Sequence, residues 1–367
     1  MKKILYVIGK MDRGGAETFL MNILRNINHK KYQFVIATFE PPKDGKKYVY
    51  TDELEAMGVK IVRLRDTRTK KPWDFTKQIE DLVRNEKIDI IHSQIDFMSA
   101  LTLPGAKRGG AQKLIAHSHN TYNFIFDSPV KNLASKILRK RLLKYATVRL
   151  ACGYEAGKYL YGTHAKFDVI PNGIDTSKFK YDSAARNRIR KQFKIPDDAA
   201  VLLNVGRLEK QKNQSFLLDI FERYSAKNSN TFLFIIGNGS LKEGLEQKIN
   251  QSTFAKNIFL LEARSDIRDF YMAADYFLLP SIYEGVPFVG IEAQTTGLKC
   301  IFSTGTPRES KIIDTTIFEP LELEKWVNSI KAPNMDKVRV KLNGSEGVKN
   351  FEIKQSVKKL EDIYDAD

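Results

Sequence analysis

The sequence predicts an α/β protein built from two doubly wound parallel sheets, one in each of two domains. Three observations lead to this prediction. The 367 residues are enough for two domains with a core each. Short apolar runs typical of buried strands alternate with stretches of helical periodicity. A Pro-Asn-Gly turn followed by a polar stretch divides the chain near its middle. Ligands of such sheets bind at the carboxyl ends of the strands, so site residues are expected there.

In the first half, the expected strands are Ile4–Ile8, Gln33–Thr38, Val59–Val62, Ile88–Ile91, Lys113–His117, Val148–Cys152 and Phe167–Ile170. Helical periodicity between them predicts helices at about Ala16–Ile27, Phe75–Asn85 and Val130–Tyr145. The first strand leads into Gly14-Gly15 and then a helix, but the sequence there is not GxGxxG, so the dinucleotide-binding fingerprint is absent.

The second half alternates in the same way. Its expected strands are Ala199–Val205, Phe232–Ile236, Asn257–Leu261 and Tyr276–Leu279, and its expected helices begin at about Ser215, span Ile267–Ala274 and open over Ile291–Thr296. The polar stretch 182–198, DSAARNRIRKQFKIPDD, is interpreted as an interdomain connection. These features predict domains at 1–176 and 177–349, followed by a helical tail over 350–367.

Composition excludes several classes of protein. No apolar run approaches the ~18 residues that are needed to span a bilayer. Lys10, Asp12 and Arg13 interrupt the apolar start too early for a secretory signal, so we expect a cytoplasmic protein. Cys152 and Cys300 lie far apart in apolar stretches and are interpreted as core residues, which excludes a disulfide framework and a cysteine-rich metal site.

Positive charge is concentrated in the first half. Residues 1–180 contain 33 Lys and Arg against 18 Asp and Glu, whereas 181–367 contain 27 against 26. This excess predicts an acidic partner: nucleic acid, an anionic membrane or an anionic substrate. No nucleic-acid-binding motif and no interleaving of aromatic with basic residues is present, so nucleic acid is disfavoured.

The densest basic stretch is Pro129–Lys144, PVKNLASKILRKRLLK. Its leucines and isoleucines recur at helical spacing, and Lys131, Lys136, Arg139, Lys140, Arg141 and Lys144 occupy the remaining arc. A basic amphipathic helix of this kind can lie on an anionic membrane surface. The alternative is a helix that packs on the core with one solvated face.

Two carboxylates mark the stretch Ser281–Gly297, SIYEGVPFVGIEAQTTG. Glu284 and Glu292 stand eight residues apart, the first in a loop after an expected strand and the second near the start of a helix. Backbone N–H groups at a helix start bind anions, and carboxylates accept hydrogen bonds from hydroxyl groups. A nucleotide sugar offers both a diphosphate and hydroxyls. An ordinary loop charge and a residue favoured by the helix dipole are the alternative interpretation.

Together with its neighbours, this stretch resembles the family 4 retaining glycosyltransferases of the GT-B fold. The matching motifs follow the family's order: GGAE at 14–17, IAHSHN at 115–120, IPNGID at 170–175, GRLEKQKN at 206–213, IIGNG at 235–239 and DYFLLPSIYEGVPFVGIEA at 275–293. The last is the most specific. A GT-B fold has two Rossmann-like domains that face each other across a cleft, and its final helix usually crosses back to the first domain, as we expect of 350–367.

The resemblance implies a role for each matching residue. Arg207 and Lys212 would hold the diphosphate of a nucleoside diphosphate sugar and stabilise its charge as it leaves. Glu284 would contact the donor sugar and Glu292 the ribose. Further substrate contacts are expected at Gly14, Gly15, Gly237, Arg264, Val286, Phe288, Val289 and Gly290. The nucleobase loop, LEARSD, lacks the family's usual glycine, so base selectivity is less firmly predicted.

Histidines also follow expected strands. His92 follows one strand, His117 and His119 follow the apolar run Lys113–Ala116 of another, and His164 lies in a loop where it is expected to be solvated. No Cys, Asp or Glu cluster accompanies the His-x-His pair, which disfavours a metal site. The resemblance implies that His119 contacts the donor sugar and stabilises the transition state, with His117 in support. Polar residues satisfied within a loop are the alternative.

The implied function is metal-independent transfer of a hexose, with retention, from a nucleoside diphosphate sugar that we expect to be UDP-linked. The acceptor would be a hydroxyl of a glycan or of a polyprenyl-diphosphate-linked sugar in bacterial surface-polysaccharide assembly. No cofactor besides the donor is expected. The single Asp-x-Asp, at 365–367, lies at a terminus, which disfavours the metal site of other glycosyltransferase folds.

Three alternatives stay open at this point. The first is a related two-domain enzyme, a nucleotide-sugar epimerase or phosphorylase. The second is a non-catalytic paralogue that binds nucleotide sugars, and the third is a basic nucleic-acid-binding protein. If the chain is a glycosyltransferase, as the resemblance implies, the enzyme would work in the cytoplasm, peripherally on the inner face of the cytoplasmic membrane.

Overall fold

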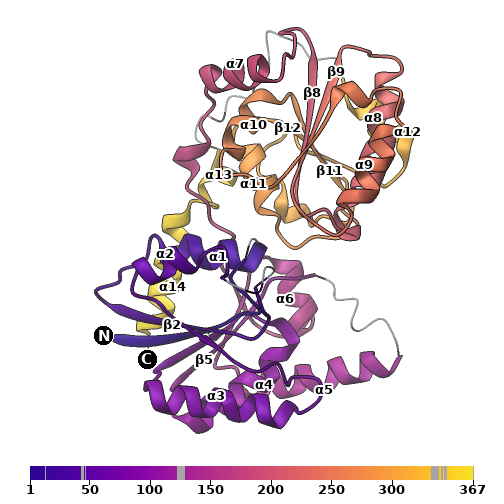
Figure 1. Cartoon of the computed structure of the whole chain (residues 1–367). Coiled ribbons are helices and arrows are strands. Elements are labelled where there is room, and N and C mark those ends of the chain that lie inside the picture. Colours follow the sequence, from indigo (N-terminus) through magenta and orange to yellow (C-terminus); the bar gives the residue numbers. More distant parts are fainter. Residues whose placement is uncertain are drawn as a thin grey trace. The chain divides into compact units, whose positions relative to one another are not determined.

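A computed structural model describes residues 1–366 with the exception of 13, 43, 44, 46, 122–128, 332–338, 340, 341, 343 and 344. The chain divides into two compact units (Figure 1). The first comprises Met1–Gly173 and Ile353–Asp367, and the second Ile174–Glu352. The sequence-based boundaries at 176 and 349 lie three residues from these.

A parallel sheet organises the first unit. Its described strands pair in the order β3-β2-β1-β4-β5-β6-β7, so the order reverses between β1 and β4. That reversal is the switch point at which doubly wound sheets bind ligands. The strands are β1 (Lys2–Val7), β2 (Tyr32–Thr38), β3 (Lys60–Arg63), β4 (Ile90–Ser93), β5 (Lys113–Ser118), β6 (Val148–Ala151) and β7 (Asp168–Val169).

Helices cover both faces of this sheet. They are α1 (Gly15–Leu24), α2 (Thr51–Ala56), α3 (Pro72–Glu86), α4 (Ser99–Gly109), α5 (Pro129–Tyr145), α6 (Tyr154–Tyr161) and α14 (Ile353–Asp365), with a 3₁₀ turn η1 (Asp96–Met98). Leu5, Val7 and Ile91 point into the core beneath α3 and α4. Side chains alternate along a strand, so Tyr6 and His92 point to the opposite face, where α14 lies.

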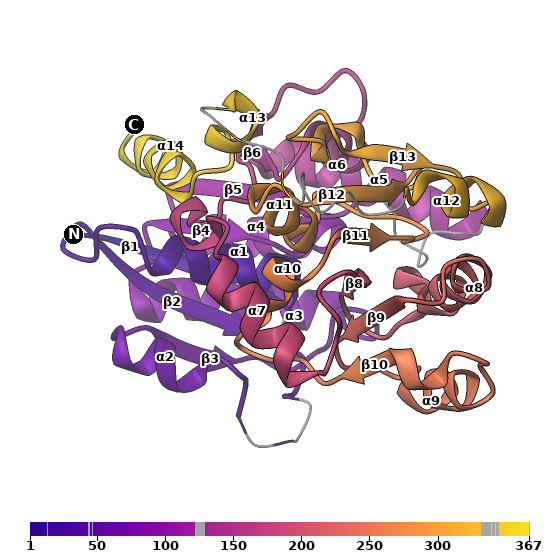
Figure 2. The same ribbon diagram turned by 90° about the horizontal axis from the view of Figure 1, so that it is seen from above.

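The second unit contains a parallel sheet whose described strands pair in the order β10-β9-β8-β11-β12-β13, which Figure 2 shows side by side. The strands are β8 (Ala200–Val205), β9 (Thr231–Ile236), β10 (Ile258–Leu261), β11 (Tyr276–Leu279), β12 (Lys299–Ser303) and β13 (Ile317–Glu319). Here the order reverses between β8 and β11. The loops that follow these two strands therefore emerge at the switch point of the sheet.

Two apolar clusters fill the faces of this second sheet. One lies beneath α8 (Gln214–Ser225), α9 (Lys242–Asn250) and α12 (Leu323–Ser329). The other lies beneath α7 (Ser183–Gln192), α10 (Ile267–Ala273) and α11 (Phe288–Thr295). The remaining described elements are short: α13 (Glu346–Lys349), η3 (Thr176–Phe179), η4 (Lys210–Lys212), η5 (Ala255–Asn257) and η6 (Arg308–Ser310).

The interpretation of 182–198 as an interdomain connection is wrong, because α7 lies within it and packs on the second unit. Asp182 caps this helix by accepting from the N–H groups of Ala184 and Ala185. Ile189 is buried in the core, but so are two arginines of the same helix. A buried face that contains arginine has a weak apolar periodicity, and the sequence pattern therefore misses it.

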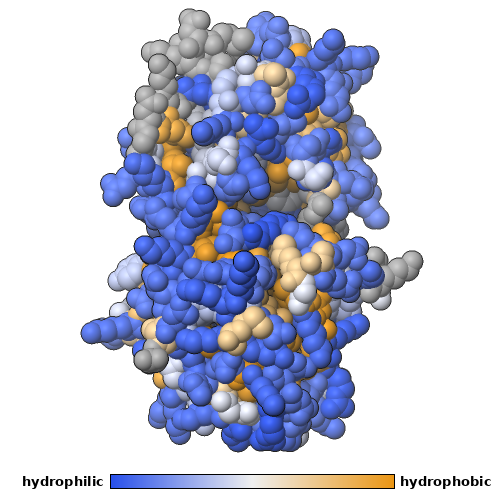
Figure 3. Space-filling view, turned by 90° about the vertical axis from the view of Figure 1, so that its left-hand side faces the viewer, coloured by the Kyte–Doolittle hydropathy of each residue, from blue (hydrophilic) through white to orange (hydrophobic). Residues whose placement is uncertain are grey.

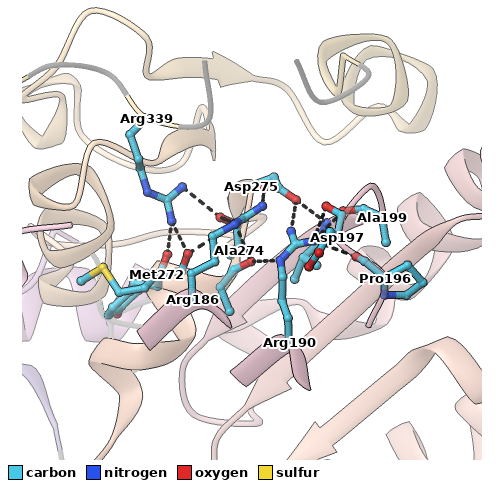
Figure 4. Close-up of polar contacts among 12 residues, drawn as sticks. Arg186, Arg190, Pro196, Asp197, Ala199, Met272, Ala274, Asp275 and Arg339 are labelled. Atoms are coloured by element: carbon cyan, nitrogen blue, oxygen red, sulfur yellow. Dashed lines mark hydrogen bonds and ion pairs between the residues drawn. The ribbon is translucent and has the colours of Figure 1, made fainter. Parts of the chain in front are cut away.

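Those arginines, Arg186 and Arg190, meet at Asp275 (Figure 4). Each donates to one oxygen of its carboxylate at 2.8 Å. Other N–H groups of Arg186, and those of Arg339, donate to backbone carbonyls at the end of α10. These carbonyls carry the negative end of the helix dipole. Burial lowers the pKa of Arg190, but Asp275 and the carbonyls stabilise its charge.

Helix α5 contradicts part of the prediction for 129–144. Of the expected apolar stripe, Leu142 is buried and Leu138 and Leu143 are partly buried. Leu133 and Ile137 are each 61% exposed. Arg139, expected on the solvated arc, instead donates to the carbonyls of α6. The helix therefore packs through its C-terminal half and exposes apolar side chains in its N-terminal half.

The surface is otherwise largely polar. On the face that Figure 3 shows, hydrophilic side chains predominate, and hydrophobic ones form scattered patches. Across the described ranges, no helix combines the length and the apolar character that crossing a membrane would require.

Asp275→Asn should lower the free energy of unfolding by about 3–5 kcal/mol, because it leaves two buried guanidinium groups without a counter-charge. Denaturant titration measures this loss. Asp269→Asn is the matched control, since the partner of Asp269 on α10, Arg188, is exposed, and it should cost less than about 1 kcal/mol. Equal losses in the two variants would contradict the proposed importance of the buried cluster.

Candidate active site

The most specific sequence motif forms a strand, a loop and a helix in the second unit. Strand β11 ends at Leu279, the loop contains Glu284, and α11 begins at Phe288, earlier than the expected opening at Ile291. Glu284 is buried. Its Oε1 lies 2.5 Å from Lys212 Nζ and accepts a hydrogen bond from Ser281 Oγ, also at 2.5 Å. The loop thus holds a buried carboxylate whose counter-charge comes from another part of the chain.

Lys212 lies in the loop that follows β8, next to β11 in the sheet. Gln211 ties the two loops together: its side chain donates to the Tyr283 carbonyl at 3.0 Å, and its own carbonyl accepts from the Ile282 N–H at 2.8 Å. Arg207 donates to the side-chain oxygen of Gln211 at 3.3 Å and is exposed. The structure therefore groups Arg207, Lys212 and Glu284 at one edge of the sheet.

Glu292 lies on α11 and accepts a hydrogen bond from the Tyr271 hydroxyl at 2.8 Å. Burial raises the pKa of Glu292 to about 7, although the hydrogen bond from Tyr271 opposes this shift. A carboxyl group that titrates near neutrality can either accept or donate hydrogen bonds. At this position it suits a partner with hydroxyl groups, which can do both.

The start of α11 presents backbone N–H groups that the helix itself does not pair. Gly290 and Ile291 both donate to the Pro287 carbonyl, so within this first turn the N–H groups of Phe288 and Val289 have no carbonyl one turn back. Pro287 provides no side-chain cap. Together with the helix dipole, these N–H groups would attract an anion. The side chains of Val286 and Phe288 are buried.

Two further candidates lie in loops of the second unit. A Cβ at Gly237 would lie 1.8 Å from the Gly206 carbonyl oxygen, so the backbone packing itself requires glycine there. Arg264 forms two hydrogen bonds with Asp266 and lies over the Phe270 ring, 4.5 Å from its centroid. Both residues therefore have structural partners in the free protein.

The glycine pair belongs to the first unit, where Gly14 is the N-cap of α1. A Cβ at Gly14 would collide with the Glu17 carboxylate, whereas a Cβ at Gly15 would meet nothing within 4 Å. The backbone at Gly15 is thus open to an approaching ligand.

His119 follows β5 in the first unit. Asp96 in η1 fixes its backbone by accepting from the His119 N–H at 3.1 Å and from the Asn120 side chain at 2.6 Å. Both ring nitrogens of His119 are buried and have no hydrogen-bond partner among the described residues. Burial lowers its pKa to about 3, so the ring is neutral near pH 7. The prediction that His92 and His117 follow strands is wrong: His92 lies within β4 and His117 within β5, both buried. His164 is exposed, as expected.

Sequence reasoning missed the residues that hold the candidates in place, namely Asp96, Gln211, Tyr271 and Ser281. Asp96 has a positive φ of 45°, a conformation that Asp tolerates better than most residues. Only its position just after a strand hinted at a role. Tyr271 lies inside a helix and shows no signal at all in the sequence. Across the part of the chain that the structure describes, no group of three His, Cys, Asp or Glu could hold a metal ion.

Comparisons with known proteins give two matching family models and several relatives. Residues 13–178 match the family model described as Glycosyltransferase Family 4, and residues 185–330 match Glycosyl transferases group 1. The chain is 30% identical to an Escherichia coli protein, UDP-Gal:alpha-D-GlcNAc-diphosphoundecaprenol alpha-1,3-galactosyltransferase, over 77% of this chain and 76% of that one. It is 28% identical to the capsular polysaccharide biosynthesis glycosyltransferase CapH of Staphylococcus aureus, over 99% of each chain.

A solved structure shares the fold. The crystal structure of Anabaena HepE in complex with UDP and glucose superposes with a TM-score of 0.80 over 100% of both chains, at 15% identity. The family models and the relatives define a glycosyltransferase. The chain belongs to the family 4 glycosyltransferases of the GT-B fold.

Glu292 should make stability depend on pH. The unfolded chain loses this proton near pH 4.5 and the folded chain near pH 7. Between these values the folded state binds more protons, so its stability falls as pH rises. Because the group is partly exposed, we expect a loss on the order of 1–2 kcal/mol.

Unfolding of wild type and Glu292→Gln at about pH 5 and about pH 8 measures this contribution. The wild type should lose stability relative to the variant across that interval. Tyr271→Phe should extend the interval to higher pH, since it removes the hydrogen bond that stabilises the carboxylate. Parallel profiles for wild type and Glu292→Gln would show that the carboxyl group is not perturbed.

Proposed function

We propose that this enzyme transfers a hexose with retention, and without a metal ion, from a UDP-sugar to a hydroxyl of a glycan or lipid-linked acceptor in surface-polysaccharide biosynthesis. The observation that carries the proposal is the buried contact of Lys212 with Glu284 beside Arg207 and the start of α11. It combines cations and free N–H groups for a diphosphate with a carboxylate for sugar hydroxyls.

The ion pair gives a simple account of donor binding. In the free enzyme, Glu284 stabilises the charge of Lys212. A diphosphate would offer Lys212 a second anion, together with Arg207 and the N–H groups of Phe288 and Val289. Glu284 would then be available to accept from hydroxyls of the sugar. As the glycosidic bond breaks, the charge that develops on the leaving diphosphate would be stabilised by these groups without a metal ion.

The other carboxyl group and the first unit complete the assignment. Glu292 would bind the ribose hydroxyls, with Tyr271 fixing its orientation. Gly15, whose backbone is open, would present its N–H group to a phosphate or to the acceptor. His119 is neutral near pH 7, and neither of its ring nitrogens has a partner among the described residues. Its ring would contact the donor sugar.

The names of the relatives support the choice of substrates. That of the Escherichia coli relative specifies a UDP-sugar donor and a diphosphoundecaprenol-linked acceptor. That of the Staphylococcus aureus relative specifies capsular polysaccharide, and the Anabaena structure contains UDP and glucose. An epimerase would need no acceptor, and a non-catalytic paralogue would bind the donor without releasing nucleotide, so product analysis separates these alternatives.

We also propose that α5 docks on the cytoplasmic face of an anionic membrane. Leu133 and Ile137 are exposed one turn apart, so they lie on one side of the helix. Exposed basic residues accompany them, namely Lys136, Lys140, Arg141 and Lys144. Apolar side chains flanked by basic ones suit an interface with anionic lipid.

Lys212→Ala and Glu284→Ala should each lower turnover by about 100-fold or more, because each removes a group that we assign to the transition state. Release of UDP and formation of the glycoside measure this loss. Lys210→Ala is the matched control: Lys210 is exposed on the same 3₁₀ turn and should change turnover by less than about threefold. Near-wild-type rates in both site variants would overturn the assignment.

Replacement of both Leu133 and Ile137 by Ser should lower binding to phosphatidylglycerol vesicles by about tenfold, since it removes the exposed apolar side chains. Vesicle sedimentation at two salt concentrations measures the binding. Trp73→Ser, which removes an exposed apolar side chain from α3, should bind as the wild type does. Unchanged binding of the double variant, or equal weakening by Trp73→Ser, would count against docking through α5.

A further inference from the structure

A row of buried polar side chains crosses one face of the first unit's sheet. Tyr6 on β1 lies directly beside His92 on β4 in the strand register. His117 on β5 points to the same face, because it lies two residues beyond Ile115, the register partner of His92. Tyr364 reaches these groups from α14, near the end of the chain. All four side chains are fully buried.

These groups form a continuous chain of contacts. The hydroxyls of Tyr6 and Tyr364 are 2.5 Å apart, Tyr364 Oη lies 2.8 Å from His92 Nδ1, and His92 Nε2 lies 3.0 Å from His117 Nδ1. Burial lowers the pKa of both histidines, so both rings are neutral near pH 7. A neutral imidazole has one N–H. Through each neutral ring the hydrogen bonds therefore run in a single direction, and losing the Tyr364 hydroxyl removes the partner that fixes which nitrogen of His92, and through it of His117, carries the proton.

His119 continues this row by stacking. Its ring lies 4.3 Å from that of His117, centroid to centroid, with 25° between the planes. Phe19 on α1 contacts both rings. Asp96 holds the backbone of His119, but no described residue forms a hydrogen bond with its ring. Packing against His117 and Phe19 is therefore what fixes the orientation of the His119 ring.

We propose that Tyr364, His92 and His117 are positioning residues that orient His119 for glycosyl transfer, and that α14 must be docked on the first unit for this orientation to exist. The proposal rests on the proposed role of His119. It gives helix α14 a part in catalysis, through Tyr364, which lies 245 residues after His119 in the sequence.

Tyr364→Phe tests this directly, because it keeps the ring and removes only the hydroxyl. We expect kcat to fall by about tenfold and the KM for the UDP-sugar to change by less than about twofold. Nitrogen-15 spectra of labelled histidines should show changed protonation of His92 and His117. Tyr6→Phe, which leaves α14 itself intact, should cause a smaller change of the same kind.

Tyr32→Phe is the matched control. It removes a hydroxyl that donates to Asp365 on the same helix at 2.8 Å. Among the hydrogen bonds that the structure describes, none joins this hydroxyl to a histidine. The variant should leave both kcat and the histidine spectra as in the wild type. If Tyr32→Phe lowered kcat as much as Tyr364→Phe, general docking of the helix would explain the loss and the positioning role would be wrong.

A double-mutant cycle separates positioning from general stability. In a His119→Ala background, Tyr364→Phe should lower kcat no further, because it acts through the missing ring. Additive losses would overturn the proposal. The spectra keep this test distinct from that of the proposed function. If the wild type had no transferase activity but Tyr364→Phe changed the histidine spectra as expected, the proposed function alone would be refuted. If Tyr364→Phe left the spectra unchanged, the positioning role alone would be refuted.

Discussion

The ion pair between Lys212 and Glu284 depends on the order of strands in the second unit. β8 and β11 are neighbours in a parallel sheet, so the loops that follow them leave at the same edge although they are 72 residues apart in sequence. Burying either charge alone would cost several kcal/mol. Each charge therefore offsets the cost of burying the other, and the Ser281 hydroxyl donates a further hydrogen bond to the carboxylate. Glu292 and the N–H groups at the start of α11 belong to the helix that follows β11.

The two units use different chemistry at equivalent edges of their sheets. The second provides fixed charges and helix N–H groups, which suit a diphosphate. The first provides neutral imidazoles and a carboxyl group, Asp96, whose pKa is raised by burial. A neutral histidine near pH 7 offers one donor and one acceptor without competing for the diphosphate.

Much of the fold could be predicted from the sequence, because buried parallel strands are continuous apolar runs. Strand β11, Tyr276–Leu279, has the predicted bounds, and the α/β class and the family are confirmed. Helix α7 could not be predicted, since its buried face includes Arg186 and Arg190, whose partner, Asp275, is distant in sequence and lies between α10 and β11. The exposure of Leu133 and Ile137 was missed for the converse reason: helical spacing shows that apolar residues share a face, but not whether a neighbour covers it.

For the site, the motifs identified residue types that would suit a nucleotide sugar, and the structure added their partners. Arg207, Lys212 and Glu284 were predicted from the resemblance, but the direct contact of Lys212 with Glu284 was not. The roles of the individual residues stay predictions. Tyr271 and Tyr364 lie inside helices, and their importance depends on carboxyl or imidazole groups that are distant in sequence. Contacts of this kind leave no local pattern in the chain.

Thermal unfolding with UDP, GDP, ADP and their sugars, all in EDTA, tests the central claim most directly. A ligand that binds only the folded state raises the Tm, and the rise grows with the logarithm of its concentration divided by its Kd. The account predicts a rise with UDP and a larger rise with one UDP-sugar, without any metal ion. No shift with any nucleotide, or a shift that appears only when a divalent cation replaces EDTA, would contradict it.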